Sequence, residues 1–240
     1  MSSSLNSSSE GARGMPVSIQ PLDLSDVSTC ASISAAAFAV DPHTIIKQLG
    51  QQPYDMFAMT RSGLEENLPK REKFVCMKAV DNRGIIVGHA SWVFSGGGQK
   101  RASQARGDKA EEDDPIERLH ALEEADMQYW LQNLVPVDTP CMFVIGLVVS
   151  PGHQGQGIGS ALLRYGNAIA DERRLSTWVH SSHQAYAAYC KAGFETRREL
   201  KIDLDAYALR PPREGEATMA DSNQWGQYVI RYMERKPGDN

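Results

Sequence analysis

The strongest structural signal in this sequence is an almost wholly apolar run, Cys141–Val149, that leads into a glycine-rich turn and then into a helix-like segment ending at Glu172. A run this apolar predicts a strand that is buried on both faces of a sheet. The segment after the turn places apolar residues at helical spacing, at Ile158, Ala161, Leu162, Tyr165, Ala168 and Ile169. Strand, tight turn and amphipathic helix together predict a protein of mixed α/β class.

The remaining chain mixes strand-like and helix-like segments. We expect further strands at Val17–Leu22, Lys73–Val80, Ile85–Phe94, Thr177–Ser181, Glu195–Leu204 and Gln227–Glu234. We expect further helices from Asp23–Ser25 to about Asp41-Pro42, and at Thr44–Leu49, Thr60–Leu68, Ile116–Leu134 and His183–Ala192. The turn Asp81–Gly84 joins two of the strands and indicates a hairpin.

A chain of 240 residues, 41% of them hydrophobic, is long enough to bury one sizeable core. We therefore expect a single domain over residues 16–236, with a flexible insertion at about 95–115 and a long loop at about 205–226. Residues 1–15 are rich in serine and have no apolar core, so we expect a disordered tail and no secretory signal there.

Charge and cysteine usage exclude several partner classes. The formal net charge of −5 and the pI of about 5.7 argue against a nucleic acid partner. The four cysteines show no CxxC spacing, which favours small buried residues over disulfides or metal ligands and fits a reducing compartment. The longest apolar run is too short to span a bilayer. We expect a cytoplasmic protein, with a nuclear location left open, that binds no metal, nucleic acid or membrane.

The turn Gln154–Ser160 has the composition of a phosphate-binding site. The first amides of a helix have no partner within the helix, and the helix dipole makes that end positive. Glycines at 155, 157 and 159 would let phosphate oxygens approach the backbone.

Two nucleotide motifs fit this turn poorly. A mononucleotide P-loop would place a lysine after Gly159, where Ser160 stands. A dinucleotide fingerprint would place a glycine at Ser160 and an acid near the end of the next strand, which instead ends Val179–Ser182. A third pattern, Gln/Arg-x-x-Gly-x-Gly/Ala, is matched at every fixed position by Gln154–Gly159.

Two blocks of the sequence resemble the GNAT superfamily, the Gcn5-related N-acetyltransferases. The first block is Leu147–Pro151 followed by Gln154–Ser160, which looks like the acetyl-CoA-binding motif of that family. The second block is similar to the family's Asn-x-x-Ala-x-x-x-Tyr-x-x-x-Gly-Phe segment. It matches at Ala185, Tyr189, Gly193 and Phe194, whereas Ser182 replaces the asparagine. Together the blocks cover about a quarter of the chain.

The resemblance implies a fold and a seat for acetyl-CoA. The fold would be a mixed, mostly antiparallel sheet of about six to seven strands flanked by helices, with a V-shaped splay between two central parallel strands. The pantetheine arm would pair with the backbone of the first strand of the splay, and the pyrophosphate would lie on the turn. The residues implied in acetyl-CoA binding are Leu147, Val148, Val149, Gln154, Gly155, Gln156, Gly157, Ile158, Gly159, Ser160 and Ser182.

The resemblance also implies a direct transfer in which an uncharged amine attacks the thioester of bound acetyl-CoA. Tyr189 matches the family position whose hydroxyl protonates the leaving sulfur; packing on a helix face is its other interpretation. The base is less clear, because Met142–Gly146 holds no acid. His180 is a candidate, since histidine titrates near neutral pH. Glu123, Glu124 and Asp126 form another, although a solvated helix face explains such a run more simply.

We expect the acceptor to be a primary amine of a small molecule, because the two long segments at 95–115 and 205–226 would overhang the acceptor side. A protein or peptide acceptor, a non-catalytic acyl-CoA sensor and a nucleotide oxidoreductase remain alternatives. A monomer and a homodimer are both compatible with the sequence.

Overall fold

The computed structural model describes residues 16–96, 114–220 and 223–238. The predicted tail at 1–15 and most of the predicted insertion at 95–115 lie outside these residues. Three of the four cysteines, Cys30, Cys76 and Cys141, are buried, whereas Cys190 is exposed, and none of the four forms a disulfide. Among the described residues no helix has the length and apolar composition needed to cross a membrane.

Seven strands form one sheet in the order β1-β2-β3-β4-β5-β7-β6. Their bounds are β1 Ser18–Pro21, β2 Phe74–Val80, β3 Ile86–Ser95, β4 Cys141–Val149, β5 Ser176–Ser181, β6 Glu195–Asp203 and β7 Gln227–Arg235. Every neighbouring pair is antiparallel except β4 and β5, which are parallel. The mostly antiparallel sheet predicted from the sequence is confirmed.

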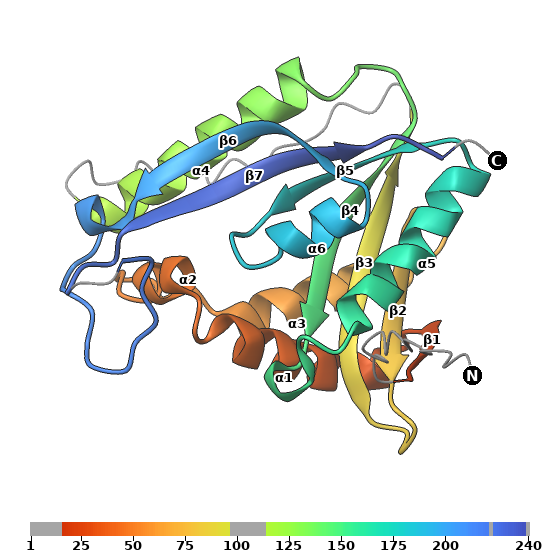
Figure 1. Cartoon of the computed structure of the whole chain (residues 1–240), viewed down its shortest axis with the longest axis horizontal. Coiled ribbons are helices and arrows are strands. Elements are labelled where there is room, and N and C mark those ends of the chain that lie inside the picture. Colours follow the sequence, from red (N-terminus) through yellow and green to blue (C-terminus); the bar gives the residue numbers. More distant parts are fainter. Residues whose placement is uncertain (1–15, 97–113, 221–222, 239–240) are drawn as a thin grey trace, which may run out of the picture.

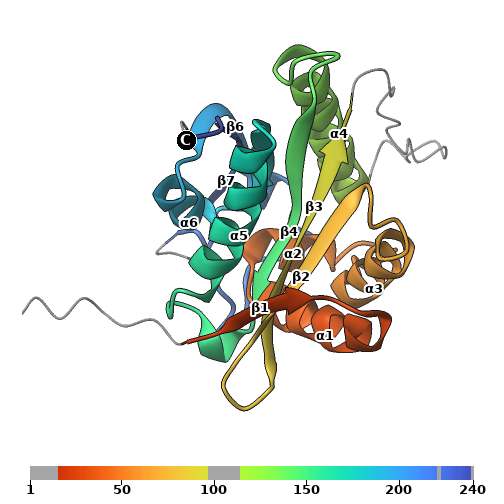
Figure 2. The same cartoon turned by 90° about the vertical axis from the view of Figure 1, so that its right-hand side faces the viewer.

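Helices cover both faces of the sheet, and Figure 2 shows α5 and α6 on one side with α1, α3 and α4 on the other. The six α-helices are α1 Val27–Phe38, α2 Pro42–Lys47, α3 Met56–Asn67, α4 Pro115–Asn133, α5 Ile158–Glu172 and α6 Tyr186–Lys191. The core under α5 and α6 includes Trp92, Met142 and Tyr189. The core under α2 and α4 includes Ile46, Trp130 and Trp178.

Two helix starts differ from the expected ones, and each has a local cause. Helix α3 begins at Met56 and not at Thr60, because the Asp55 side chain accepts a hydrogen bond from the Ala58 amide and caps the helix earlier. Helix α6 begins only at Tyr186, because residues 183–185 form a turn after Ser182.

The two parallel strands diverge, as predicted (Figure 1). Their pairing joins Cys141–Val144 to Ser176–Val179, and in the described chain it ends there although β4 continues to Val149. On the other edge of β4 the pairing to β3 steps from Val144 to Gly146, which leaves Ile145 as an extra residue. Such a bulge bends the strand that carries it. The bulge therefore accompanies the point at which β4 separates from β5.

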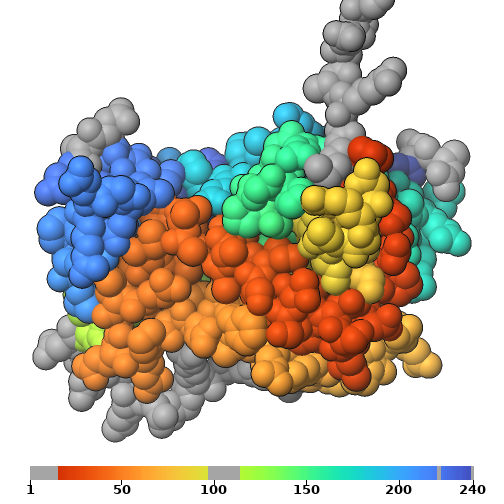
Figure 3. Space-filling view, turned by 90° about the horizontal axis from the view of Figure 1, so that it is seen from below, coloured from red at the N-terminus to blue at the C-terminus, as the bar shows by residue number. Residues whose placement is uncertain are grey.

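The loop at 205–226 is held in place by polar contacts. Asp205 accepts hydrogen bonds from the amides of Trp225, at 2.9 Å, and Gly226, at 2.8 Å. Arg210 and Glu216 form a two-point ion pair. Trp225 is fully buried and shares one core with Ile46 of α2. In the space-filling view, the blue surface of this loop lies beside the orange surface that includes α2 (Figure 3).

Candidate active site

The glycine turn leads from β4 into α5 in a backbone conformation that favours glycine. Gly155 has a φ of +74° and Gly157 a φ of +82°, both in the left-handed region. The first hydrogen bond of the helix runs from the Ala161 amide to the Gly157 carbonyl. The amides of residues 158–160 precede this bond, so they are free to meet an anion in the way that helix starts do.

The edge of β4 that faces the splay carries peptide groups without a strand partner. The Ser150 amide donates to Val87 of β3, so residues 148 and 150 direct their peptide groups toward β3. Because directions alternate along a strand, Leu147 and Val149 direct theirs into the splay. The Val149 carbonyl accepts a hydrogen bond of 3.1 Å from the Gln154 side chain, which is consistent with that direction. An extended ligand could pair with this edge as an additional strand would.

Two residues of the second sequence block lie beside the splay, on and before α6. Tyr189 is 3% exposed, and its ring meets the Phe194 ring edge-on at 5.2 Å between centroids. Burial raises the pKa of the Tyr189 phenol above its usual value, so the phenol keeps its proton at neutral pH. The Ser182 hydroxyl accepts a hydrogen bond from the Ala185 amide and so supports the turn before α6. Their predicted roles toward acetyl-CoA stay predictions.

His180 lies where the two parallel strands begin to separate. It follows Val179, the last residue of β5 that pairs with β4. The side chain remains exposed to solvent, although burial and the charges of His43 and Lys47 lower the pKa of its imidazole to about 4. In the described chain the ring has no hydrogen-bond partner, and it contacts Tyr232 at 5.3 Å between centroids.

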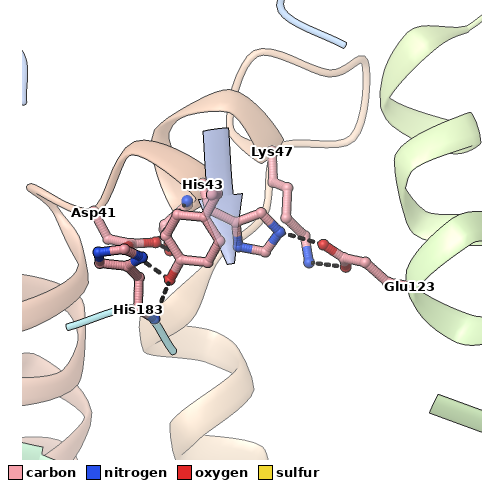
Figure 4. Close-up of polar contacts among 7 residues, drawn as sticks. Asp41, His43, Lys47, Glu123 and His183 are labelled. Atoms are coloured by element: carbon pink, nitrogen blue, oxygen red, sulfur yellow. Dashed lines mark hydrogen bonds and ion pairs between the residues drawn. The ribbon is translucent and has the colours of Figure 1, made fainter. Parts of the chain in front are cut away.

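Three charged or titratable side chains meet between α2 and α4 (Figure 4). Glu123 of α4 accepts a hydrogen bond from His43 of α2 on one oxygen, and from the Lys47 ammonium at 2.8 Å on the other. The three side chains are between 11% and 16% exposed. Burial alone would raise the pKa of Glu123, but the contacts with His43 and Lys47 outweigh it and lower the pKa to about 2. Glu123 is therefore an anion at all physiological pH values.

A second polar group fixes the start of α2 against β7. Asp41 is 1% exposed and caps α2 by accepting hydrogen bonds of 2.9 Å from the Thr44 amide and hydroxyl. Its other oxygen accepts a hydrogen bond of 3.0 Å from the Tyr228 hydroxyl, which in turn accepts one from the His183 amide. The His43 ring stacks on the Tyr228 ring at 4.9 Å between centroids. Helix α2 is thus tied to the sheet directly beside the His43–Glu123 contact.

The acidic run on α4 divides into different environments. Glu123 and Asp126 point into the protein, and Asp126, 7% exposed, pairs with Arg198 of β6 at 3.0 Å. Glu124 is exposed and accepts only a long hydrogen bond of 3.3 Å from Gln128 within the described residues. The simpler explanation of this run, a solvated helix face, therefore holds for Glu124 and is wrong for the other two.

Sequence reasoning missed the partners of Glu123. His43 and Lys47 are spaced four residues apart, which places them on one face of a helix. This spacing can be seen in the sequence, but α2 is short. No local sequence pattern indicates that α4, which comes some 75 residues later, lies opposite α2. The sequence predicts a helix end near Asp41. In the structure the Asp41 side chain caps the start of the next helix, α2, and accepts a hydrogen bond from the Tyr228 hydroxyl.

A protein-family model matches the sequence of this chain. The family model described as "Acetyltransferase (GNAT) family" matches residues 44–194. No curated protein sequence is significantly similar to the chain.

Solved structures share its fold at low sequence identity. Arylalkylamine N-acetyltransferase 2 from Aedes aegypti has a TM-score of 0.64 at 14% identity, over 92% of this chain and 99% of that one. A structure described as histone acetyltransferase HPA2 and related acetyltransferase, from Corynebacterium glutamicum, has a TM-score of 0.55 at 20% identity, over 94% and 99%. A mutant agmatine N-acetyltransferase in its apo form has a TM-score of 0.58 at 16% identity, over 92% and 99%. With the family model matching well over half of its length, the chain belongs to the GNAT family of acetyltransferases.

Proposed function

We propose that this protein transfers the acetyl group of acetyl-CoA to the primary amine of a small molecule, directly, within a complex that holds both substrates. One observation carries the proposal. Beyond Val144 the edge of β4 has no strand partner in the described chain; at one end it leads into the amides of the glycine turn, and at the other it begins beside His180, whose charged neighbours include Glu123, His43 and Lys47. Such an arrangement suits an extended thioester bound on one side and an amine presented from the other.

The residues of the turn and of β4 fit the chemistry of acetyl-CoA. Pantetheine contains two amide groups, and Leu147 and Val149 offer donors and acceptors directed into the splay. The left-handed glycines at 155 and 157 leave room for the pyrophosphate, and the helix start supplies amides and a positive dipole. No basic side chain is required within the turn.

The transfer itself makes one bond and breaks one. The amine nitrogen attacks the acetyl carbonyl carbon to form a C–N bond, and the C–S bond breaks to release the CoA thiolate. The thiolate must gain a proton and the amine must lose one. We assign the first transfer to Tyr189, whose buried phenol is protonated at neutral pH. Backbone amides of β4 at the bulge would polarise the carbonyl.

We expect a small acceptor and not a protein. The described part of the loop at 205–226 packs beside α2 through Trp225, and we expect it to narrow the acceptor side. The fold alone does not distinguish a small acceptor from a protein acceptor, since it is shared by proteins named for histone and for arylalkylamine acetylation.

The proposal is tested by measuring CoA release from acetyl-CoA with a panel of aliphatic, aromatic and polyamine substrates, and with amino-terminal peptides. We expect saturable release with at least one small primary amine and none with the peptides. Release with peptides alone would overturn the small-molecule assignment. Tight acetyl-CoA binding with no release on any acceptor would indicate a sensor, and binding of NAD(P)H without acetyl-CoA would indicate an oxidoreductase.

A further inference from the structure

We propose that His43 accepts the proton that the amine loses, and that Glu123 positions His43 and stabilises its charged form. This inference rests on the proposed function, because it assigns a step of the same transfer. It is carried by a contact between two helices that are far apart in sequence, α2 and α4, at the acceptor end of the splay (Figure 4).

The orientation of the His43 ring follows from its partner. Glu123 is an anion and can only accept hydrogen bonds, so His43 Nε2 must carry a proton and donate it to Glu123. In the neutral imidazole, Nδ1 then holds a lone pair. Within the described residues Nδ1 has no hydrogen-bond partner, and it is not among the polar atoms sealed from solvent. His43 therefore presents a basic nitrogen to water or to a bound amine.

Lys47 shares the carboxylate of Glu123 with His43. The Lys47 ammonium already balances the single charge of Glu123, at 2.8 Å. When His43 takes a proton from the amine, the adjacent carboxylate stabilises the imidazolium, as an orienting acid does in other histidine-based sites.

The ring is also held in place from its other face. It stacks on Tyr228, whose hydroxyl donates to the buried Asp41. Both the plane of the imidazole and the direction of Nδ1 are thus fixed by groups on α4, β7 and the start of α2. Preorganisation of this kind distinguishes a working base from a surface histidine.

The position of His43 near the start of the splay fits the proposed reaction. His180 marks the point at which β4 and β5 separate, and His43, Lys47 and Glu123 are its principal charged neighbours. His180 itself has no orienting partner in the described chain, and a pKa of about 4 makes it a weak base at neutral pH. The charged and titratable groups that interact with His43 are Glu123, Tyr228 and His180. Lys47 and Asp41 lie one contact further away, on Glu123 and on Tyr228 respectively.

The proton transfer balances without a further reactant. A primary alkylamine arrives as an ammonium ion and loses one proton to His43 Nδ1, which passes it to solvent. The neutral amine then attacks the thioester, and the nitrogen of the resulting adduct carries a positive charge. One N–H bond breaks as His43 Nδ1 takes the proton, directly or through one water. The C–S bond breaks, the thiolate is protonated, and His43 returns its proton to solvent after the products leave.

The test compares amines that must lose a proton before they attack with amines that are already neutral. Each primary alkylamine of the panel is paired with an alkoxyamine of matching size, which is already neutral at pH 7. For His43→Gln we expect kcat/KM to fall about 100-fold or more with the alkylamine at pH 7. With the alkoxyamine we expect less than about a tenth of that loss, because the base then has only the second, easier deprotonation to perform.

Two further variants separate a base from a structural role. Added imidazole should restore part of the alkylamine activity of His43→Ala, which a packing role does not predict. Glu123→Gln should lower kcat about tenfold and move the pH profile, because it keeps the shape of the contact but removes the charge. Glu124→Gln, one position away on the same helix and exposed, is the matched control and should behave as wild type.

The outcomes distinguish this inference from the proposed function. If wild type turns over the amines and His43→Gln keeps its pH profile and its preference between the paired amines, the role of His43 is refuted while the acetyltransferase stands. If wild type binds acetyl-CoA but releases CoA with no amine, both are refuted. Unchanged acetyl-CoA affinity, measured by calorimetry, shows that each variant is folded.

Discussion

Tyr189 is the single side chain on which the release of CoA depends in this account. Burial raises the pKa of its phenol, which therefore keeps a proton that it can give to the leaving thiolate in the proposed transfer. Tyr189→Phe keeps the ring and its contact with Phe194 but removes the proton, so we expect kcat to fall by about 100-fold with little change in acetyl-CoA affinity. Steady-state kinetics and calorimetry measure the two effects. Full activity of this variant across the pH range would show that Tyr189 only packs.

A substitution at Gly157 tests whether the glycine turn binds the phosphate groups of acetyl-CoA. Its φ of +82° strains any other residue, by roughly 1–2 kcal/mol. Gly157→Ala should therefore weaken acetyl-CoA binding about tenfold or more, since the amides of the turn move as the strain relaxes. Gly152→Ala is the control in the same segment, because a side chain there would meet no atom within 4 Å. Equal affinities for the two variants would argue against phosphate binding at this turn.

His89 gives a pH dependence that is independent of catalysis. It is 3% exposed, contacts Ser34 at 3.0 Å, and burial lowers its pKa from 6.5 to about 4. Between these values the unfolded chain binds more protons than the folded one, so the free energy of unfolding falls as the pH drops from 6.5 to 4. The slope from this one group approaches about 1.4 kcal/mol per pH unit. Urea titrations should show the slope reduced in His89→Gln; an unchanged slope would mean that His89 titrates normally.

Helix α5 packs closely on β3 where Gly166 faces Trp92. A methyl group added at Gly166 would lie 2.3 Å from the Trp92 ring, and Trp92 is 1% exposed. Gly166→Ala should therefore lower the free energy of unfolding by about 1–3 kcal/mol. Gly63→Ala is the matched change in α3, where the same methyl meets nothing, and it should stabilise by about 0.5–1 kcal/mol. Effects of the same sign would contradict this packing.

The elements themselves were largely predictable, and the acceptor side was not. The apolar run of β4 and the stripe on α5 depend on local pattern, so their type and approximate bounds follow from the sequence. The glycine turn could be placed because its spacing is local too. The His43–Glu123 contact depends on how α2 and α4 cross the sheet, which no local pattern records. The capping role of Asp41 was likewise hidden, because Asp-Pro also marks a helix end.

In the proposed reaction, the whole molecule divides its two tasks between the two sides of one splay. The β4 edge, the glycine turn and α5 would hold acetyl-CoA, whereas α2, α4 and β7 bring together the polar groups that would face the acceptor. This division predicts that acceptor-side variants such as His43→Gln change turnover without changing acetyl-CoA affinity, and that turn variants such as Gly157→Ala do the reverse.

The central claim is direct transfer between the two sides, and a single-turnover experiment with isotope-labelled acetyl-CoA tests it most directly. The enzyme, in excess over labelled acetyl-CoA, is mixed with an accepted amine and quenched over time, and both protein and small molecules are analysed by mass spectrometry. We predict that the label appears on the amine nitrogen as CoA is released, with no labelled protein at any time. Labelled protein that forms before the product, or label that never reaches an amine, would contradict the account.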